Sequence, residues 1–141
     1  MESKNTGDLN RELMDASNID SYMKQNESVF TNESISEMLT QLYESKSISK
    51  ALLARKAGMS EVYLHQVFSG RRNPSRDRLI TICIGMGATL EETQSMLKLA
   101  GYAEIYPRIR RDAIIGFGIM HGQELNEIND KLFAEQEETL F

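Results

Sequence analysis

The spacing of small, turn-forming and apolar residues over positions 49–73, SKALLARKAGMSEVYLHQVFSGRRN, constrains this chain more than any other feature. Two short helices that cross steeply need a small residue where they touch, a turn residue that tolerates a positive φ, and apolar anchors on the second helix. Ala54 is the small residue and Gly58 is the turn. Leu64 and Val67 are the anchors. The spacing therefore predicts two short helices that meet at a tight turn.

Capping residues predict further helices around this pair. Ser34 with Glu37, and Thr89 with Glu92, have the spacing of capping boxes, in which each side chain bonds the backbone amide of the other residue. Serine caps for the helices between them stand at Ser49, Ser60 and Ser75. No sustained alternation of apolar and polar residues indicates a strand. The fold class is therefore all-α, with five short helices between residues 34 and 103.

The two ends of the chain differ from this centre. Residues 1–33 are polar and acidic with few apolar side chains, which predicts a partly ordered N-terminal arm with one or two short helices. Residues 104–141 contain an apolar segment, 108–121, and then a helix of about 125–134. This part is expected to form an additional C-terminal helical hairpin, so three parts are predicted with boundaries at 33/34 and 103/104.

The C-terminal hairpin repeats the preceding sequence at an offset of 35 residues. RDRLITICIGMGATLEETQSML (76–97) aligns with RDAIIGFGIMHGQELNEINDKL (111–132), and eight of the 22 positions are identical. Either one helical hairpin is used twice, the second copy packing on the first, or two amphipathic hairpins are alike by coincidence. Gly116 and Gly118 interrupt a helical segment, which indicates a close helix approach within the chain or to a second subunit.

Charge is segregated along the chain, although its net charge is only −5. Residues 45–80 contain eight basic and two acidic residues, a net charge of +6, whereas residues 1–44 carry −6 and residues 81–141 carry −5. Because ionic screening limits the reach of charges to about 8–10 Å, a local basic patch can attract a polyanion even on an acidic protein. The basic segment coincides with the two crossing helices.

With Ser-Gly-Arg-Arg-Asn-Pro-Ser following at once, residues 48–70 resemble the phage-repressor-like helix-turn-helix family of bacterial transcriptional regulators, also called the xenobiotic-response-element family. The resemblance covers roughly residues 35–101. It implies a compact five-helix repressor-like domain that binds double-stranded DNA with Glu61–Phe68 as its recognition helix. We expect this helix to enter the major groove, and the protein to bind as a dimer because one small module gives limited affinity. More narrowly, the chain is similar to a subgroup of small regulators from Gram-positive bacteria, whose genes often lie near a Ser/Thr kinase gene.

By position, the resemblance implies two sets of DNA contacts. The side chains expected to face base edges are Ser60, Glu61, Val62, Tyr63 and Gln66. The side chains expected to contact the DNA backbone are Lys50, Arg55, Arg71, Arg72 and Arg76, with Arg78 as a further candidate. Gln66 can pair with adenine, Glu61 can accept from cytosine, and Val62 can touch a thymine methyl. Contacts to phosphate add affinity but carry no sequence information.

A protein-interaction adaptor is the alternative function. The second helix contains no lysine or arginine, and Val62, Tyr63 and Phe68 could form a protein-binding face on a helix-turn-helix kept only as a scaffold. The partner would be a Ser/Thr kinase or another basic protein that meets the acidic arm. Arg71 and Arg72 would then belong to an ordinary solvated turn.

Other functions find no support in the sequence. His65 and His121 lie far apart without Cys, Asp or Glu at ligand spacing, so neither a metal nor another cofactor is expected. No nucleophile, base and orienting group share a motif, so the chain is not expected to be an enzyme. The single cysteine, Cys83, is expected to pack as a small hydrophobe in a reducing cytoplasm. No apolar run reaches the length of a membrane span.

Overall fold

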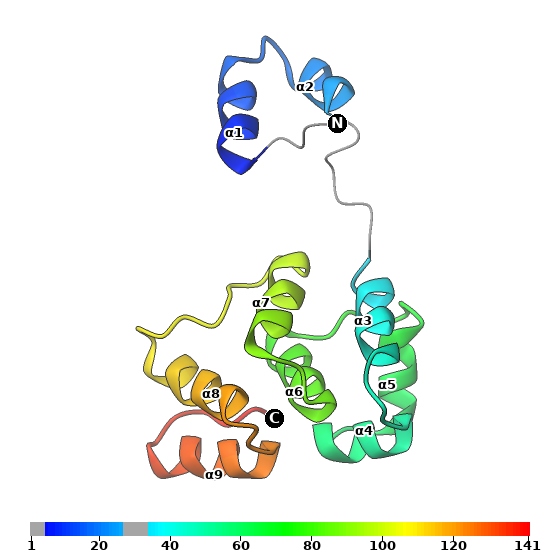
Figure 1. Cartoon of the computed structure of the whole chain (residues 1–141), viewed down its shortest axis with the longest axis vertical. Coiled ribbons are helices and arrows are strands. Elements are labelled where there is room, and N and C mark those ends of the chain that lie inside the picture. Colours follow the sequence, from blue (N-terminus) through cyan, green and yellow to red (C-terminus); the bar gives the residue numbers. More distant parts are fainter. Residues whose placement is uncertain (1–4, 27–33) are drawn as a thin grey trace. The chain divides into compact units, whose positions relative to one another are not determined.

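The computed structural model of the chain describes residues 5–26 and 34–141, and within these ranges all regular structure is helical (Figure 1). The chain divides into two compact units, Met1–Glu33 and Ser34–Phe141, which we call the arm and the main unit. The arm contains α1 (Thr6–Asp15) and α2 (Ile19–Gln25). The main unit contains α3 (Ile35–Glu44), α4 (Lys50–Ala57), α5 (Glu61–Phe68), α6 (Arg76–Met86), α7 (Leu90–Leu99), α8 (Arg110–Met120) and α9 (Leu125–Ala134).

Asparagine caps begin both helices of the arm. Asn5 and Asn18 each accept a hydrogen bond of 2.8 Å from the backbone amide three residues further on. Asn26 Nδ2 donates to Glu12 Oε2 at 3.0 Å, which ties the end of α2 to α1. The sequence predicts one or two short helices here, and two are present. The partial order expected of residues 1–33 stays a prediction, and residues 1–4 and 27–33 lie outside the described residues.

Hydroxyl caps begin the first five helices of the main unit, as the sequence predicts. Each cap oxygen accepts a hydrogen bond of 3.1 to 3.2 Å from the amide three residues further on. The caps are Ser34, Ser49, Ser60, Ser75 and Thr89. The capping box at Thr89 is complete, because the Thr89 amide donates to Glu92 Oε1 at 2.8 Å. Each such cap stabilises its helix by about 1 kcal/mol.

Helix α6 is the centre of the main unit. Seven of its 11 residues are buried, and it packs against α4, α7 and α9. A helix that is apolar on nearly all sides must be covered on all sides, which explains why the elements of the main unit surround it. In Figure 1, α3 and α5 lie on one side of α6, and α8 and α9 lie on the other.

The repeat seen in the sequence is present in the fold as repeat one, residues 76–106, and repeat two, residues 111–141. Each consists of a helix, a left-handed glycine turn, a second helix and a return segment. The turn glycines, Gly87 and Gly122, have φ of 71° and 67°. A second left-handed residue follows two positions after the second helix of each repeat. These residues are Gly101 and Gln136, with φ of 78° and 59°. Because α6 contacts α9 and α7 contacts α8, the repeats pack about an approximate two-fold axis.

Two reciprocal arginine–aspartate pairs join the repeats across this axis. Arg76 NH2 lies 2.9 Å from Asp112 Oδ2, and Arg111 NH2 lies 2.9 Å from Asp77 Oδ2. Both arginines bind bidentately, with each NH1 donating to the second carboxylate oxygen. The hydrogen bonds that Arg111 donates to Asp77 raise the pKa of Arg111. Adding 35 to the residue numbers of Arg76 and Asp77 gives Arg111 and Asp112, so the two pairs are equivalent. This favours one helical hairpin used twice and argues against coincidence.

The return segments are also bound in equivalent ways. Arg76 Nε donates to the Ala103 carbonyl at 2.9 Å, and Arg111 Nε donates to the Glu138 carbonyl at 2.8 Å. Gln94 then makes two hydrogen bonds to the backbone of residue 105, whereas Asn129 only accepts one, of 2.8 Å, from the amide of residue 140. The buried Asn129 Nδ2 has no partner among the described residues, because its side chain is one methylene shorter.

Gly118 permits the close approach that the sequence indicates between helices. A Cβ atom at this position would lie 2.4 Å from Ile128 Cγ1, a distance that real Cβ atoms do not reach. Gly116 is less constrained, because its Cβ would lie 3.3 Å from Ile105 Cγ2. Of the two possibilities left open by the sequence, packing within the chain therefore explains Gly118.

Candidate nucleic-acid interface

Helices α4 and α5 form the predicted pair of short helices around a glycine turn. Gly58 ends α4 with φ of 68°, and the Met59 amide returns to the Ala54 carbonyl at 3.0 Å. Ala54, Leu64 and Val67 are all buried. Glycine is also needed on α6, because a Cβ at Gly85 would lie 2.9 Å from Leu53 Cδ1. The two helices are therefore held at a fixed angle by small residues and buried anchors.

The outer side of α5 presents side chains to solvent. Glu61 is exposed and Val62 is 68% exposed, which is unusual for an aliphatic residue at the start of a helix. Tyr63 and Gln66 are half-buried on the same helix. Ser60 is committed to capping, since its Oγ accepts from the Tyr63 amide at 3.1 Å. Four of the five expected base-reading side chains thus lie along α5, and the fifth fixes its first turn.

Cations from outside α5 gather on its aromatic side chain. The guanidinium of Arg78, on α6, lies 4.6 Å from the ring centroid of Tyr63, and that of Arg72 lies 5.9 Å from the same centroid. Helix α5 contains no lysine or arginine of its own. The positive charge beside its exposed side is therefore supplied by the loop after it and by the first turn of α6.

Lys50 lies at the start of α4 and over aromatic rings of two other helices. Its Nζ is 5.3 Å from the ring centroid of Phe68 and 5.8 Å from that of Tyr43. These two rings pack edge to face, with centroids 5.2 Å apart. The aromatic pair limits the freedom of the lysine, so that its ammonium group is held beside the end of α5.

The loop that carries Arg71 and Arg72 is tied to the end of α5 through the backbone. The amides of both arginines donate to the Gln66 carbonyl, at 2.9 and 3.2 Å. Gly70, with φ of 80°, supplies the left-handed residue that this return needs. Both arginine side chains are exposed. The loop therefore presents two cations at a defined place rather than on a free segment.

Arg76 requires a correction. From the sequence it is expected to contact the DNA backbone, but four of its five N–H donors are used inside the fold, on Asp112 and on the carbonyls of Ala103 and Glu104. Its guanidinium joins the two repeats and is not available to phosphate. The alignment of Arg76-Asp77 with Arg111-Asp112 marks these residues as equivalent in the sequence, but it does not show that they pair between the repeats.

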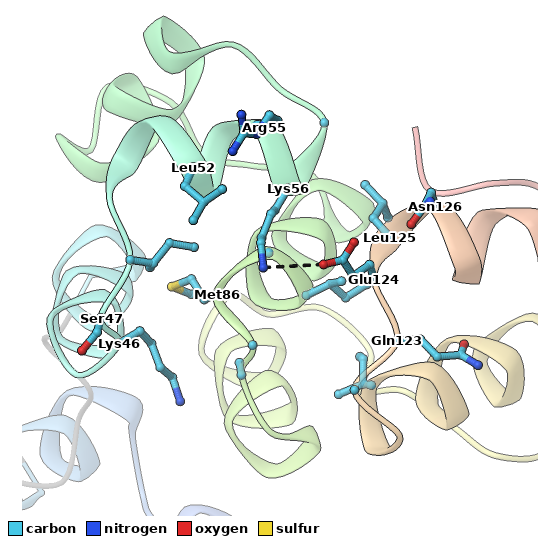
Figure 2. Close-up of a pocket in the computed structure, with 18 of the residues that line it drawn as sticks. Lys46, Ser47, Leu52, Arg55, Lys56, Met86, Gln123, Glu124, Leu125 and Asn126 are labelled. Carbon is cyan, nitrogen blue, oxygen red and sulfur yellow. Dashed lines mark ion pairs between the residues drawn. The ribbon is translucent and has the colours of Figure 1, made fainter.

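Arg55 lies apart from the other expected backbone contacts, beside a cavity of about 940 Å³. Figure 2 shows this cavity between α4 and the turn that joins α8 to α9, with Arg55, Lys56 and Leu52 on the α4 side. Lys56 Nζ points across it to Glu124 Oε1 at 3.6 Å. Arg55 thus adds to the local positive charge without joining the cluster around Tyr63.

Cys83 and the acidic residues give no sign of other chemistry. Burial raises the pKa of the Cys83 thiol to about 12, so it stays protonated and unreactive. Over residues 5–26 and 34–141, no three His, Cys, Asp or Glu side chains are grouped as a metal site would require. In the same ranges, no helix has the length and apolar character needed to cross a membrane.

Comparison with known proteins agrees with this geometry. A family described as helix-turn-helix matches residues 39–92, which run from α3 to the first turn of α7. Searches of curated proteins and of solved structures found no match. The match contains the turn at Gly58, all of α5 and the arginine loop. Residues 39–92 of this chain are therefore similar to the repressor-like helix-turn-helix family.

Proposed function

We propose that the protein is a sequence-specific transcriptional regulator that inserts α5 into the major groove of double-stranded DNA as a dimer. The observation that carries this proposal is the set of cations beside α5: Arg72 and Arg78 lie over Tyr63, Lys50 lies over Phe68, and Arg71 follows α5 in a loop whose backbone is bonded to Gln66. A helix with cations beside it can place its own side chains on base edges while the cations contact the phosphate backbone.

Within this proposal the side chains of α5 have separate roles. Gln66 reads adenine through a bidentate pair, and Val62 contacts a thymine methyl. Glu61 accepts a hydrogen bond from cytosine, which offsets its repulsion by phosphate. Tyr63 positions Arg72 and Arg78 with its ring face and contacts the DNA at the edge of the helix. Ser60 holds the first turn through its cap, so its effect on base reading is indirect.

The phosphate contacts come from cations that the fold leaves available. Lys50, Arg71 and Arg72 keep the roles expected from the sequence, and Arg78 takes the place of Arg76. Arg55 contributes to the local field. Four phosphate contacts give a binding constant that falls with roughly the third to fourth power of the salt concentration per bound copy, because each contact releases condensed counterions. Such a regulator acts in the cytoplasm, where bacterial DNA is found.

A protein-interaction adaptor is the second candidate, and the exposure of Val62 favours it. An aliphatic side chain that is 68% exposed on a short helix is also suited to a protein contact. In that function α5 would form a protein-binding face and the acidic arm would meet a basic partner such as a Ser/Thr kinase. DNA would be bound weakly and without preference. The two candidates therefore differ in sequence preference.

Selection of bound fragments from a random DNA pool, with the full chain, tests the proposal. Enrichment of a split motif with two-fold symmetry is the expected result, because two copies of α5 would contact half-sites about one helical turn apart. The selected fragment should bind at least about a thousandfold more tightly than scrambled DNA at the same salt concentration. Without enrichment, and with equal binding to all fragments, the regulator function would be wrong and the adaptor favoured.

A further inference from the structure

Helix α8 of repeat two has an exposed apolar face. The equivalent face of α6, in repeat one, is covered by the helix-turn-helix. On α6 this face consists of Arg78, Ile82 and Gly85, at i, i+4 and i+7. Arg78 contacts Tyr63 of α5, Gly85 approaches Leu53 of α4, and Ile82 is fully buried between them. In repeat one, helices α4 and α5 of the helix-turn-helix therefore pack on this face.

Repeat two has the same face without that cover. The residues 35 positions further on are Ala113, Phe117 and Met120, and all three are exposed, Phe117 at 52% and Met120 at 62%. The Phe117 ring stacks on His121 with centroids 3.9 Å apart, which leaves its other side open. Apart from Val62, every exposed large apolar residue described in the main unit belongs to residues 106–141. Of these, Phe117 and Met120 share the α8 face, and neighbouring exposed apolar side chains favour an interaction surface there.

A groove of about 530 Å³ runs beside this face, and its rim has balanced charge. Ala113, Ile114 and Phe117 line the groove together with Arg110 and Lys131. Arg110 pairs with Glu135 and Glu137, and Lys131 Nζ lies 3.0 Å from Glu135 Oε1. Two cations and two anions make a neutral rim, which selects neither a strongly acidic nor a strongly basic partner. A neutral rim of mixed sign can face a second copy of itself without repulsion.

We infer that α8 is a self-association surface, in which the Phe117–Met120 face of one copy packs against the same face of a second copy. The helix-turn-helix of another copy cannot occupy this face, because Leu53, Ala54 and Ala57 of its α4 are already buried in its own main unit. The exposed residues follow a 3–4 spacing along α8, as a helix–helix seam requires. Helix α8 lies on the side of α6 opposite α5 (Figure 1), so pairing through α8 leaves both α5 helices free.

This inference rests on the proposed function only for its role: pairing through α8 supplies the two copies that a split DNA site needs. The test is sedimentation equilibrium of the full chain, comparing Phe117→Asp/Met120→Asp with a matched control, Ser95→Asp/Asn126→Asp. The control adds the same two charges at exposed positions off the face. We expect the wild type and the control to dimerise, and the face variant to associate at least about tenfold more weakly.

DNA binding separates this inference from the proposed function. The face variant should bind a single half-site as the wild type does and lose cooperative binding to the split site. If the chain binds no DNA but the face variant still abolishes dimerisation, the proposed function fails and the α8 interface stands. A wild type that is monomeric at about 100 µM and on the split site would overturn the interface, as would equal association of face variant and control.

Disulfide trapping covers the case in which the charged variant does not fold. Phe117→Cys places a thiol at the centre of the face, and the native Cys83 is buried and does not compete. Mild oxidation should produce a covalent dimer from Phe117→Cys, but not from Ser95→Cys. A covalent dimer from neither variant, or from both equally, would contradict pairing through α8.

Discussion

Repeat one and repeat two have the same internal contacts but different surroundings. Each offers an arginine to the other's aspartate, and each closes with a left-handed turn and a bound return segment. Repeat one carries the helix-turn-helix on one face of α6, whereas the matching face of α8 is open. The internal contacts therefore belong to the hairpin itself, and the outer face is where the two copies have taken different roles.

The largest expected effect is on the pairs that join the repeats. Asp112 is only 3% exposed and accepts from Arg76 and from the Tyr106 amide at 3.0 Å, whereas Asp77 is half-buried. Asp112→Asn should therefore lower the free energy of unfolding by about 3 kcal/mol, because it leaves Arg76 without its counter-ion. Asp77→Asn should cost about half as much. Urea denaturation of both variants tests this ranking; equal losses would mean that the pairs are equivalent despite their different burial.

The next largest effect on stability is expected where the two repeats differ in side-chain size at the same helix–helix contact. At the contact between the two helices, Cys83 and Thr93 of repeat one correspond to Gly118 and Ile128 of repeat two. The first residue is smaller in repeat two and the second is larger. Gly118→Ala should cost about 2 kcal/mol through overpacking, and Gly116→Ala should cost close to nothing. Combining Gly118→Ala with Ile128→Ala should destabilise by less than the sum of the single changes. Strict additivity in thermal unfolding would show that this contact does not limit the packing.

A smaller effect is expected at the left-handed residue of each return segment. Gln136 adopts φ of 59° where repeat one has a glycine, Gly101. Gln136→Gly should stabilise the protein by about 1 kcal/mol, because it removes the strain of a side chain in this conformation. Gly101→Ala should destabilise it by a similar amount. Opposite signs in denaturation are the expected result, and destabilisation by both changes would argue against strain at Gln136.

The smallest effect concerns pH and the caps of the second helices. The Thr89 amide and Lys46 lower the pKa of Glu92 below 4.5, so ionised Glu92 stabilises the fold above that value. This stabilisation is lost as the pH falls from about 4.5 through the lowered pKa of the folded state. Glu92→Gln should flatten the stability curve in this window by a few tenths of a kcal/mol, since the pair is partly exposed. Glu127→Gln at the equivalent position of repeat two serves as the control, because Glu127 has no lysine partner among the described residues.

Much of this fold follows from short-range rules. Serine and threonine caps and glycine turns act within a few residues, so the helix boundaries from Ser34 to Leu99 could be predicted. The turn at Gly58 and the anchors Leu64 and Val67 follow from spacing alone. The repeat was visible as well, because identical residues recur at a constant offset.

The pairing of side chains over long distances could not be predicted. Arg76 and Arg78 stand two residues apart on one helix, and their sequence does not say which one faces Tyr63 and which one faces Asp112. That choice depends on how repeat two packs against α6. The sequence marked Lys50 and Arg78 as candidate backbone contacts, but it did not show that Lys50 lies over Phe68 or that Arg78 lies over Tyr63. Helix α5 has no lysine or arginine of its own, and only the structure shows which cations lie beside it.

The central claim is that α5 reads bases while its neighbouring cations hold phosphates. Its most direct test is titration of Gln66→Ala and Arg71→Ala against the selected fragment and scrambled DNA at two salt concentrations. Gln66→Ala should lose roughly 5- to 150-fold on the selected fragment and little on scrambled DNA. Arg71→Ala should lose affinity for both, with a salt slope shallower by about one. Equal losses on both DNAs for both variants would contradict base reading by α5.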